Sequence, residues 1–216
     1  VKIKEEPVKE EPVKEEPVEE EPEVVDDDNR LSQLKLVELN KWTQEWNEWS
    51  SAGISSFDAS SVMHQNRNKT SKELIKEKKS NSLNYSDDQL KELNELEKQA
   101  LKAYRSKTRL TKLKHFSFED KENLGLISTI MMTQDYQFAV EMKVDESSYY
   151  QAKSGFVPPV IECELQHQLM ITGLKQIDYW CYLKGYDGIL IKVDRNDTFI
   201  SDLLDSENKI FSKIKN

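Results

Sequence analysis

Glu141 and Lys143 are the pair whose types and spacing best suit chemistry. They lie in the otherwise apolar run 138–143, and alternation along a strand turns both side chains to one face. Glutamate is a hard oxygen ligand for Mg²⁺, and lysine can orient an attacking water or steady a phosphate oxygen. The pair therefore suits metal-dependent phosphodiester hydrolysis, although Glu-x-Lys on an exposed strand is more often a solvated cross-strand pair.

Three further segments accompany this pair. Trp46-Asn47-Glu48-Trp49 is followed by residues 53–63, which read GISSFDASSVM, and residues 163–173 read CELQHQLMITG. Together these segments resemble the YqaJ-like viral recombinase family, whose members are relatives of phage lambda exonuclease. The resemblance covers about residues 40–214. It implies the PD-(D/E)XK nuclease fold, a bacterial or phage-encoded protein, and digestion of double-stranded DNA during recombination.

The resemblance also assigns functions to individual residues. Glu97, in the segment LEKQALKAY, matches the family's helical glutamate at the metal site, and Glu141 and Lys143 match its acid-x-Lys pair. Gln166 matches the second glutamine of a QxQ helix beside the active site. Glu97 and Glu141 would hold Mg²⁺ or Mn²⁺. Asp135 is the candidate for a third acid if the hairpin register allows it, although a turn residue is the simpler interpretation.

The sequence departs from the family pattern at four positions. Ile130 stands where the metal-binding aspartate is expected, and isoleucine cannot ligate a hard cation. Ser50 and Phe57 replace an arginine and a serine that are associated with the 5′ phosphate end. Glu164 replaces the first glutamine of the QxQ helix. We therefore expect a nuclease with impaired catalysis; the alternative is an inactive relative that binds DNA or a partner such as a phage-type single-strand annealing protein.

Charge is unevenly distributed along the chain. Residues 1–28 repeat Lys-Glu-Glu-Pro-Val and contain 4 lysines and 13 acids, so their net charge of −9 equals that of the whole chain. Such a segment has little apolar surface to bury. We therefore expect residues 1–29 to be a disordered acidic tail and residues 30–216 to form one exonuclease-like domain.

The remainder of the chain is electrically neutral, which leaves nucleic-acid binding open. No acid lies between Glu97 and Glu119, but seven basic residues do. This basic segment consists of Lys98, Lys102, Arg105, Lys107, Arg109, Lys112 and Lys114. We expect it to contact DNA phosphates, and the alternative is a solvated helix end and loop.

The cysteines and the apolar residues argue against a disulfide-rich, zinc-binding, secreted or membrane protein. Cys163 and Cys181 have no CxxC spacing, which argues against a disulfide scaffold or a zinc site. No apolar run approaches the length of a membrane span, and no signal-peptide pattern is present, so we expect a cytoplasmic protein without a membrane partner. The resemblance further implies a homotrimer, as in some relatives.

Periodicity predicts the elements that position these residues. Helices are expected over residues 31–49, 58–64, 71–79, 86–105, 160–172 and 197–214. Strands are expected over residues 110–118, 124–133, 136–144, 177–183 and 188–193. This order predicts an α/β or α+β fold in which helices flank a mixed sheet.

Overall fold

The computed structural model describes residues 27–80, 82–83 and 85–216, so most of the predicted tail lies outside the described residues. Its centre is a six-stranded sheet with the order β1-β2-β3-β4-β5-β6. The strands are β1 (Leu34–Val37), β2 (Leu113–Asp120), β3 (Ile127–Thr133), β4 (Ala139–Lys143), β5 (Gln176–Cys181) and β6 (Ile189–Asp194). Neighbours are antiparallel except β4 and β5, which are parallel because a helical crossover joins them. The predicted mixed sheet flanked by helices is confirmed.

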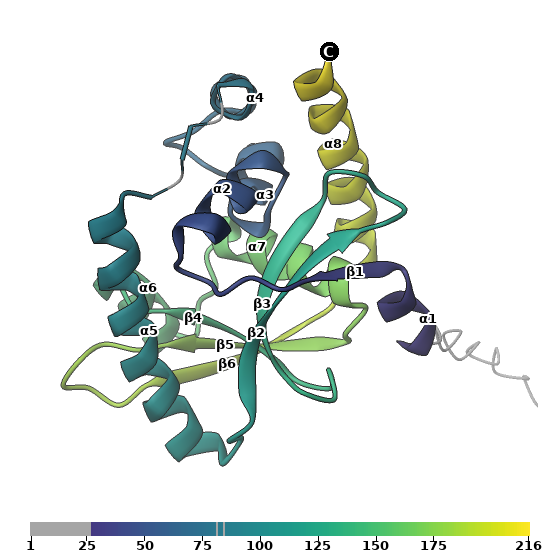
Figure 1. Cartoon of the computed structure of the whole chain (residues 1–216). Helices are drawn as coiled ribbons and strands as arrows, with labels where there is room; N and C mark the ends of the chain where they lie inside the picture. The colour runs from purple at the N-terminus through teal and green to yellow at the C-terminus, as the bar shows by residue number, and fades with distance from the viewer. Residues whose placement is uncertain (1–26, 81, 84) are drawn as a thin grey trace, which may run out of the picture.

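Helices cover both faces of this sheet. They are α1 (Asp27–Ser32), α2 (Gln44–Ala52), α3 (Ser56–Val62), α4 (Ser71–Lys79), α5 (Asp87–Thr108), α6 (Glu146–Lys153), α7 (Pro159–Thr172) and α8 (Asp197–Lys215). α5 shares an apolar cluster with Met131 and Val140, whereas α7 packs against the opposite face through Leu165 and Leu169. In Figure 1, α5 lies at the lower left and α8 rises at the upper right. Within the described part of the chain, no helix has both the length and the apolarity to span a membrane.

Local sequence signals explain where the principal helices begin and end. At the start of α5, the Gln89 backbone N–H donates to the Ser86 hydroxyl, and the Gln89 side chain accepts from the Ser86 backbone N–H. This reciprocal capping box satisfies two donors that the helix leaves unpaired. α7 begins at Pro159 and ends before Gly173, whose φ of 77° lies in the left-handed region that glycine favours. The predicted helices over residues 71–79, 86–105 and 160–172 are confirmed.

The prediction for residues 31–49 is wrong in its first half. α1 ends at Ser32, and residues 34–37 form β1, which pairs with β2 from Leu34 opposite Asp120. The helix resumes only at α2, where the Thr43 side chain accepts from the Trp46 backbone N–H. The apolar residues of the segment 34–37 fit the periodicity of a helix and also that of a strand. Pairing with β2 decides in favour of the strand. α6 was not predicted, because few of its side chains face the core.

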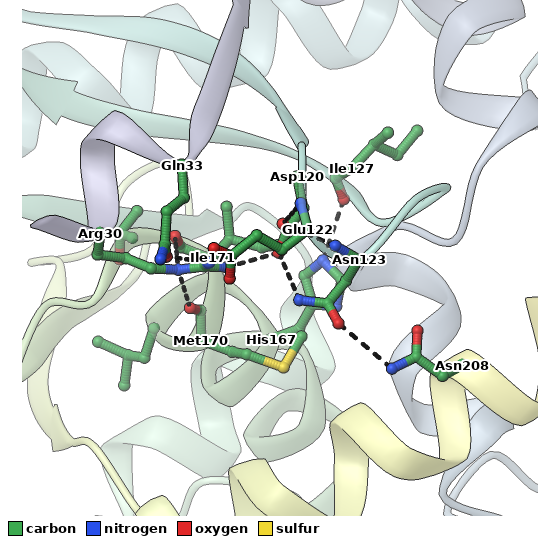
Figure 2. A network of polar contacts seen from close by, with 12 residues as sticks. Arg30, Gln33, Asp120, Glu122, Asn123, Ile127, His167, Met170, Ile171 and Asn208 are labelled. Carbon is green, nitrogen blue, oxygen red and sulfur yellow. Dashed lines mark hydrogen bonds and ion pairs between the residues drawn. The ribbon is translucent and has the colours of Figure 1, made fainter.

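Arg30 of α1 fixes the C-terminal end of α7 (Figure 2). Its Nε donates to the carbonyl oxygens of Met170 and Ile171 at 3.2 and 3.1 Å. Its guanidinium also pairs with Asp120 of β2 at 2.6 Å. Carbonyl groups at a helix end lack partners within the helix, so one arginine satisfies them and joins α1, β2 and α7. The position of α7 beside the sheet is set partly from the N-terminal side of the domain.

His167 joins α7 to β3 and α8. It is fully buried, with one ring nitrogen 2.8 Å from Glu207 Oε1 and the other 3.0 Å from the carbonyl oxygen of Ile127. Burial alone would lower the pKa of His167, but the Glu207 carboxylate raises it above its ordinary value. The histidine of the QHQ segment therefore has a structural role: it holds α7 against the sheet.

Candidate active site

The acid-x-Lys pair lies on β4 and faces α7. Lys143 Nζ is 3.1 Å from Glu141 Oε1 and 2.7 and 2.8 Å from the two carboxylate oxygens of Glu164. Gln168 lies one helical turn after Glu164, on the same face of α7, and its Nε2 donates to Glu141 Oε2 at 2.7 Å. These four residues form one polar cluster, the β4–α7 cluster, in which both carboxylates are 5% exposed.

Two carboxyl groups share one ammonium in the β4–α7 cluster. Burial alone would lower the pKa of Lys143, but Glu141 and Glu164 raise it well above its ordinary value. Burial raises the pKa of Glu164 to about 7, with Lys143 opposing and Glu141 adding to the shift. For Glu141, Lys143 and Lys41 overcome burial and lower the pKa. Lys143 therefore stays charged at neutral pH, and Glu164 is the carboxyl that exchanges a proton there.

Aromatic rings cover the β4–α7 cluster. The centroid of the Phe57 ring lies 5.7 Å from Lys143 Nζ, and the Phe57 and Tyr85 rings meet edge to face at 6.4 Å. Burial raises the pKa of Tyr85 to about 12, and the charges of Lys143 and Glu164 also act on its hydroxyl. Trp42 and Trp46 extend this layer, with centroids 5.6 and 6.2 Å from that of Tyr85. The acid-x-Lys pair is thus enclosed by α7 and aromatic side chains.

Glu97 belongs to a second polar cluster, on the α5 face. Its Oε2 accepts from Lys41 Nζ at 3.0 Å and from Trp42 Nε1 at 2.8 Å, and its Oε1 lies 2.6 Å from His115 Nε2. Although burial opposes the shift, Lys41 lowers the pKa of both Glu97 and Glu141. The connection between the two carboxylates is therefore electrostatic, through Lys41. Glu97 lines a cavity of about 800 Å³ formed by α5, β2 and residues 36–43.

Gln166 bonds to residues outside the β4–α7 cluster. Its Nε2 donates to Glu162 and to the carbonyl oxygen of Asp194, and its Oε1 accepts from the Asn196 backbone N–H. These bonds tie α7 to the connection between β6 and α8. Two residues along a helix rotate a side chain by about 200°, so Gln166 cannot share a face with Glu164. Gln168 is the glutamine beside Glu141.

Asp135 lies in the turn between β3 and β4. Its Oδ1 accepts from the Thr133 hydroxyl at 2.6 Å and from the Gln137 backbone N–H at 3.2 Å, and these bonds lower its pKa. This geometry is that of a turn residue. Across residues 27–80, 82–83 and 85–216, no three His, Cys, Asp or Glu side chains gather into a group that could hold a metal ion.

Of the altered positions, Glu164 belongs to the β4–α7 cluster, Phe57 lies beside it, and Ile130 and Ser50 are buried. Ladder pairing of β3 with β4 reaches Met131 opposite Val140, so Ile130 stands one step beyond it, on the face that Glu141 shares. Its side chain is fully buried in the apolar core. Ser50 is also buried, and its carbonyl oxygen accepts from Lys78 Nζ at 3.4 Å. Lys78 in turn forms a buried ion pair with Asp58 at 2.8 Å, so a positive charge already lies beside position 50.

The basic segment runs from α5 into β2. Arg109 ends α5 with a φ of 63°, and Lys102, Arg109 and Lys112 are exposed. Other members have partners: Lys98 pairs with Glu95 at 2.6 Å, Arg105 donates to the Leu113 carbonyl, Lys107 donates to the Gly188 carbonyl, and Lys114 lies over the Phe116 ring. The segment lies on the α5 side of the sheet, beside Glu97, and its contacts leave an exposed positive rim.

A family model of the YqaJ-like viral recombinase domain matches residues 45–175, or 131 of the 216 residues. The chain belongs to the YqaJ-like viral recombinase family. LHK-Exo in complex with dAMP has a similar structure, with a TM-score of 0.66, 17% identity, and coverage of 80% of this chain and 93% of that one. The structure of the alkaline exonuclease LHK-Exo from Laribacter hongkongensis is similar with a TM-score of 0.65 and 18% identity, and the coverage of both chains is the same. No curated protein matches this YqaJ-like chain. At these identities the structural likeness shows a shared fold.

Sequence reasoning missed several residues of this YqaJ-like site. Gln168 carries a detectable signal, because it lies four residues after Glu164 and therefore on the same helix face. Lys41, Tyr85 and His115 carry no such signal. Each comes from a distant part of the chain and reaches its cluster only through tertiary packing.

Proposed function

We propose that this protein is a DNA-recombination nuclease by descent whose phosphoryl-transfer chemistry is impaired. The observation that carries the proposal is the pairing of Lys143 with both oxygens of Glu164 at 2.7 and 2.8 Å. A lysine that orients water or steadies a phosphate oxygen must present its donors to the substrate. Here Glu141 and Glu164 accept those donors, and the Phe57 ring covers the ammonium.

The side chains around Glu141 do not form a set of ligands that fits Mg²⁺ or Mn²⁺. Lys143 donates to Oε1 and Gln168 donates to Oε2, so both oxygens of Glu141 already accept hydrogen bonds. Ile130 brings no oxygen to the position at which the resemblance expects an aspartate. A hard cation needs several oxygen ligands, and a neighbouring ammonium repels it. The disagreement between these residues and the expected ion supports impaired chemistry.

Access to the site supports the same proposal. The side chain of Lys143 is 16% exposed, and the carboxylates beside it are nearly buried. The Phe57 ring lies 5.7 Å from the ammonium, so a duplex phosphate that approached from that side would have to displace the ring. Phosphoryl transfer depends on positioning and charge neutralisation, so a covered and self-paired lysine contributes little to either.

A nuclease assay on the purified full chain tests this proposal. The substrate is linear duplex DNA with a 5′ phosphate, incubated with Mg²⁺ and separately with Mn²⁺, and LHK-Exo serves as the positive control. We expect a rate at least about 100-fold below that control, since each lost metal ligand or charge clamp costs orders of magnitude. Rapid digestion would overturn the impairment. Digestion that survives Glu141→Gln would also overturn the placement of chemistry on β4.

The second candidate is a binding protein without turnover, and the enclosure of the β4–α7 cluster favours it. The exposed basic segment supports contact with the phosphates of double-stranded DNA, because each neutralised phosphate releases counterions. Anisotropy of a labelled duplex measures this binding. The triple variant Lys102→Glu, Arg109→Glu and Lys112→Glu should weaken it at least tenfold and flatten its salt dependence. The control Lys209→Glu with Lys213→Glu, on exposed positions of α8, should change it less than threefold.

The remaining parts of the proposal concern assembly and location. A homotrimer, a phage-type annealing protein as partner, and a cytoplasmic location follow from the family resemblance. Light scattering of the purified chain measures its mass and tests the trimer directly. Co-purification with a phage-type single-strand annealing protein tests the partner. If the purified protein is a monomer and no annealing protein co-purifies, the proposed function is limited to acting on or binding DNA.

A further inference from the structure

Two adjoining cavities form a groove along α5. The first, of about 800 Å³, lies between α5, residues 36–43 and the start of β2. The second, of about 510 Å³, continues along α5 towards its C-terminal end. Lys98 and Leu101 line both cavities, so the two are continuous on this face. We call this feature the α5 groove.

The α5 groove has a basic rim and an apolar floor. The exposed cations along it are Lys98, Lys102 and Lys114. Its acids are Glu38 and Glu97, and Glu97 is already neutralised by Lys41 at 3.0 Å. Apolar side chains form the floor, among them Leu36, which is 48% exposed, and Leu101. The groove therefore suits an acidic ligand that carries spaced apolar side chains.

The groove also borders the stretch of β2 that lies beyond its pairing with β1, where the Leu113 carbonyl oxygen already accepts from Arg105. β1 pairs with Ser117–Asp120 of β2, whereas Leu113–Phe116 pair with β3 and line the groove on their other side. Backbone groups along an unpaired edge can accept an extended segment. An extended chain is therefore a better fit than a compact ligand.

We infer that the acidic repeat at residues 1–26 of this same chain occupies the α5 groove. Its Glu-Glu pairs supply carboxylates that match the lysines of the rim, and its valines, which recur every five residues, supply apolar side chains that match the floor. Charge complementarity carries the assignment: residues 1–26 hold 4 lysines and 11 acids, a net charge of −7 out of the chain's −9, and the α5 side holds its longest run of cations. Proline at every fifth position favours extended backbone, which the groove requires.

The length of the repeat permits this contact. Arg30 anchors α1, so the repeat leaves the domain at a defined point. From Asp27 the chain reaches Leu36, at the mouth of the groove, within about 20 Å, given the rise of a short helix and a strand. A 26-residue extended segment spans about 80 Å. Tethering also gives the repeat an effective concentration of about a millimolar, so weak contacts suffice.

Zero-length cross-linking of the full chain tests the inference without any DNA. A carbodiimide joins a carboxylate to an amine where the two touch, and mass spectrometry identifies the joined residues. We expect links from the glutamates of residues 5–23 to Lys98, Lys102 and Lys114. These should exceed links to the exposed control lysines Lys209 and Lys213 at least tenfold, and should fall at 1 M salt because of screening. Equal linking to both groups would overturn the assignment.

An isotope mixture separates docking within one molecule from docking between molecules. Unlabelled and ¹⁵N-labelled chains are mixed before cross-linking, and links within one molecule carry a single label. A majority of mixed-label links would overturn the intramolecular assignment. Lys98→Glu with Lys102→Glu should raise the protease susceptibility of residues 1–26 at least threefold, whereas Lys209→Glu with Lys213→Glu should leave it unchanged. Equal susceptibility in both variants would also overturn the inference, whatever the protein does to DNA.

Discussion

Lys143 Nζ contacts both carboxylate oxygens of Glu164, at 2.7 and 2.8 Å. A glutamine is expected at position 164 from the family resemblance, and an amide would offer one neutral acceptor instead of a carboxylate. The substitution therefore converts a neighbour of the site into an ion-pair partner for its lysine. Charge-assisted bonds of this kind are about twice as strong as neutral ones, so Lys143 is directed towards α7.

Restoring the site should restore exonuclease activity. We expect Ile130→Asp, Phe57→Ser and Glu164→Gln together to raise the rate of Mg²⁺-dependent digestion of linear duplex DNA at least tenfold, because they supply an oxygen ligand, open the cover and release Lys143. Adding Ser50→Arg should contribute less, since Lys78 already lies beside that buried position. Glu141→Ala in this background should abolish the gain. A folded restored variant without any gain would contradict this account of the impairment.

Lys143 should matter more for stability than a lysine in an exposed ion pair. Lys143→Met leaves two buried carboxyl groups without their cation, and we expect it to lower the free energy of unfolding by about 3–5 kcal/mol. The matched control is Lys192→Met, which breaks the pair with Asp178 at a side chain that is 59% exposed. We expect Lys192→Met to lower the free energy of unfolding by less than about 1 kcal/mol. Urea denaturation measures both, and equal losses would argue against a buried charged cluster.

The pH dependence of stability should reveal Glu164. Its pKa is raised from an ordinary value of 4.5 to about 7 by burial, so the folded state binds its proton more tightly than the unfolded state does. The resulting stabilisation is complete below pH 4.5, declines as the pH rises and is lost above about pH 7. Glu164→Gln should remove this decline. Unfolding free energies of the two proteins at pH 5, 6, 7 and 8 test the sign; a difference that stays constant would contradict it.

The two glutamines of the QHQ segment should behave differently. Gln166 makes three hydrogen bonds, two of them to backbone groups, so we expect Gln166→Ala to lower the free energy of unfolding by about 2–4 kcal/mol. Gln168 donates one bond to Glu141, and among the described residues its Oε1 has no hydrogen-bond partner. We expect Gln168→Ala to cost about 1 kcal/mol. Thermal denaturation ranks the variants, and the reverse order would contradict the observed register of α7.

Several features followed from the sequence alone. The helix over residues 71–79 and the helix that ends at Gly173 were predictable, because caps and the 3.6-residue period are local signals. The shared face of Glu141 and Lys143 followed from strand alternation, and the segments near positions 46–63 and 163–173 indicated the family, which the comparison confirmed.

Tertiary structure decided the rest. Residues 34–37 form an edge strand because β2 offers them partners, although their spacing also fits a helix. Glu97 meets Lys41 and His115, and Glu141 meets Gln168, only because distant segments are packed together. Glu164 captures Lys143 only because α7 lies against β4. Local patterns specify which way a side chain points along its own element; partners from distant segments depend on long-range packing, which no local pattern contains.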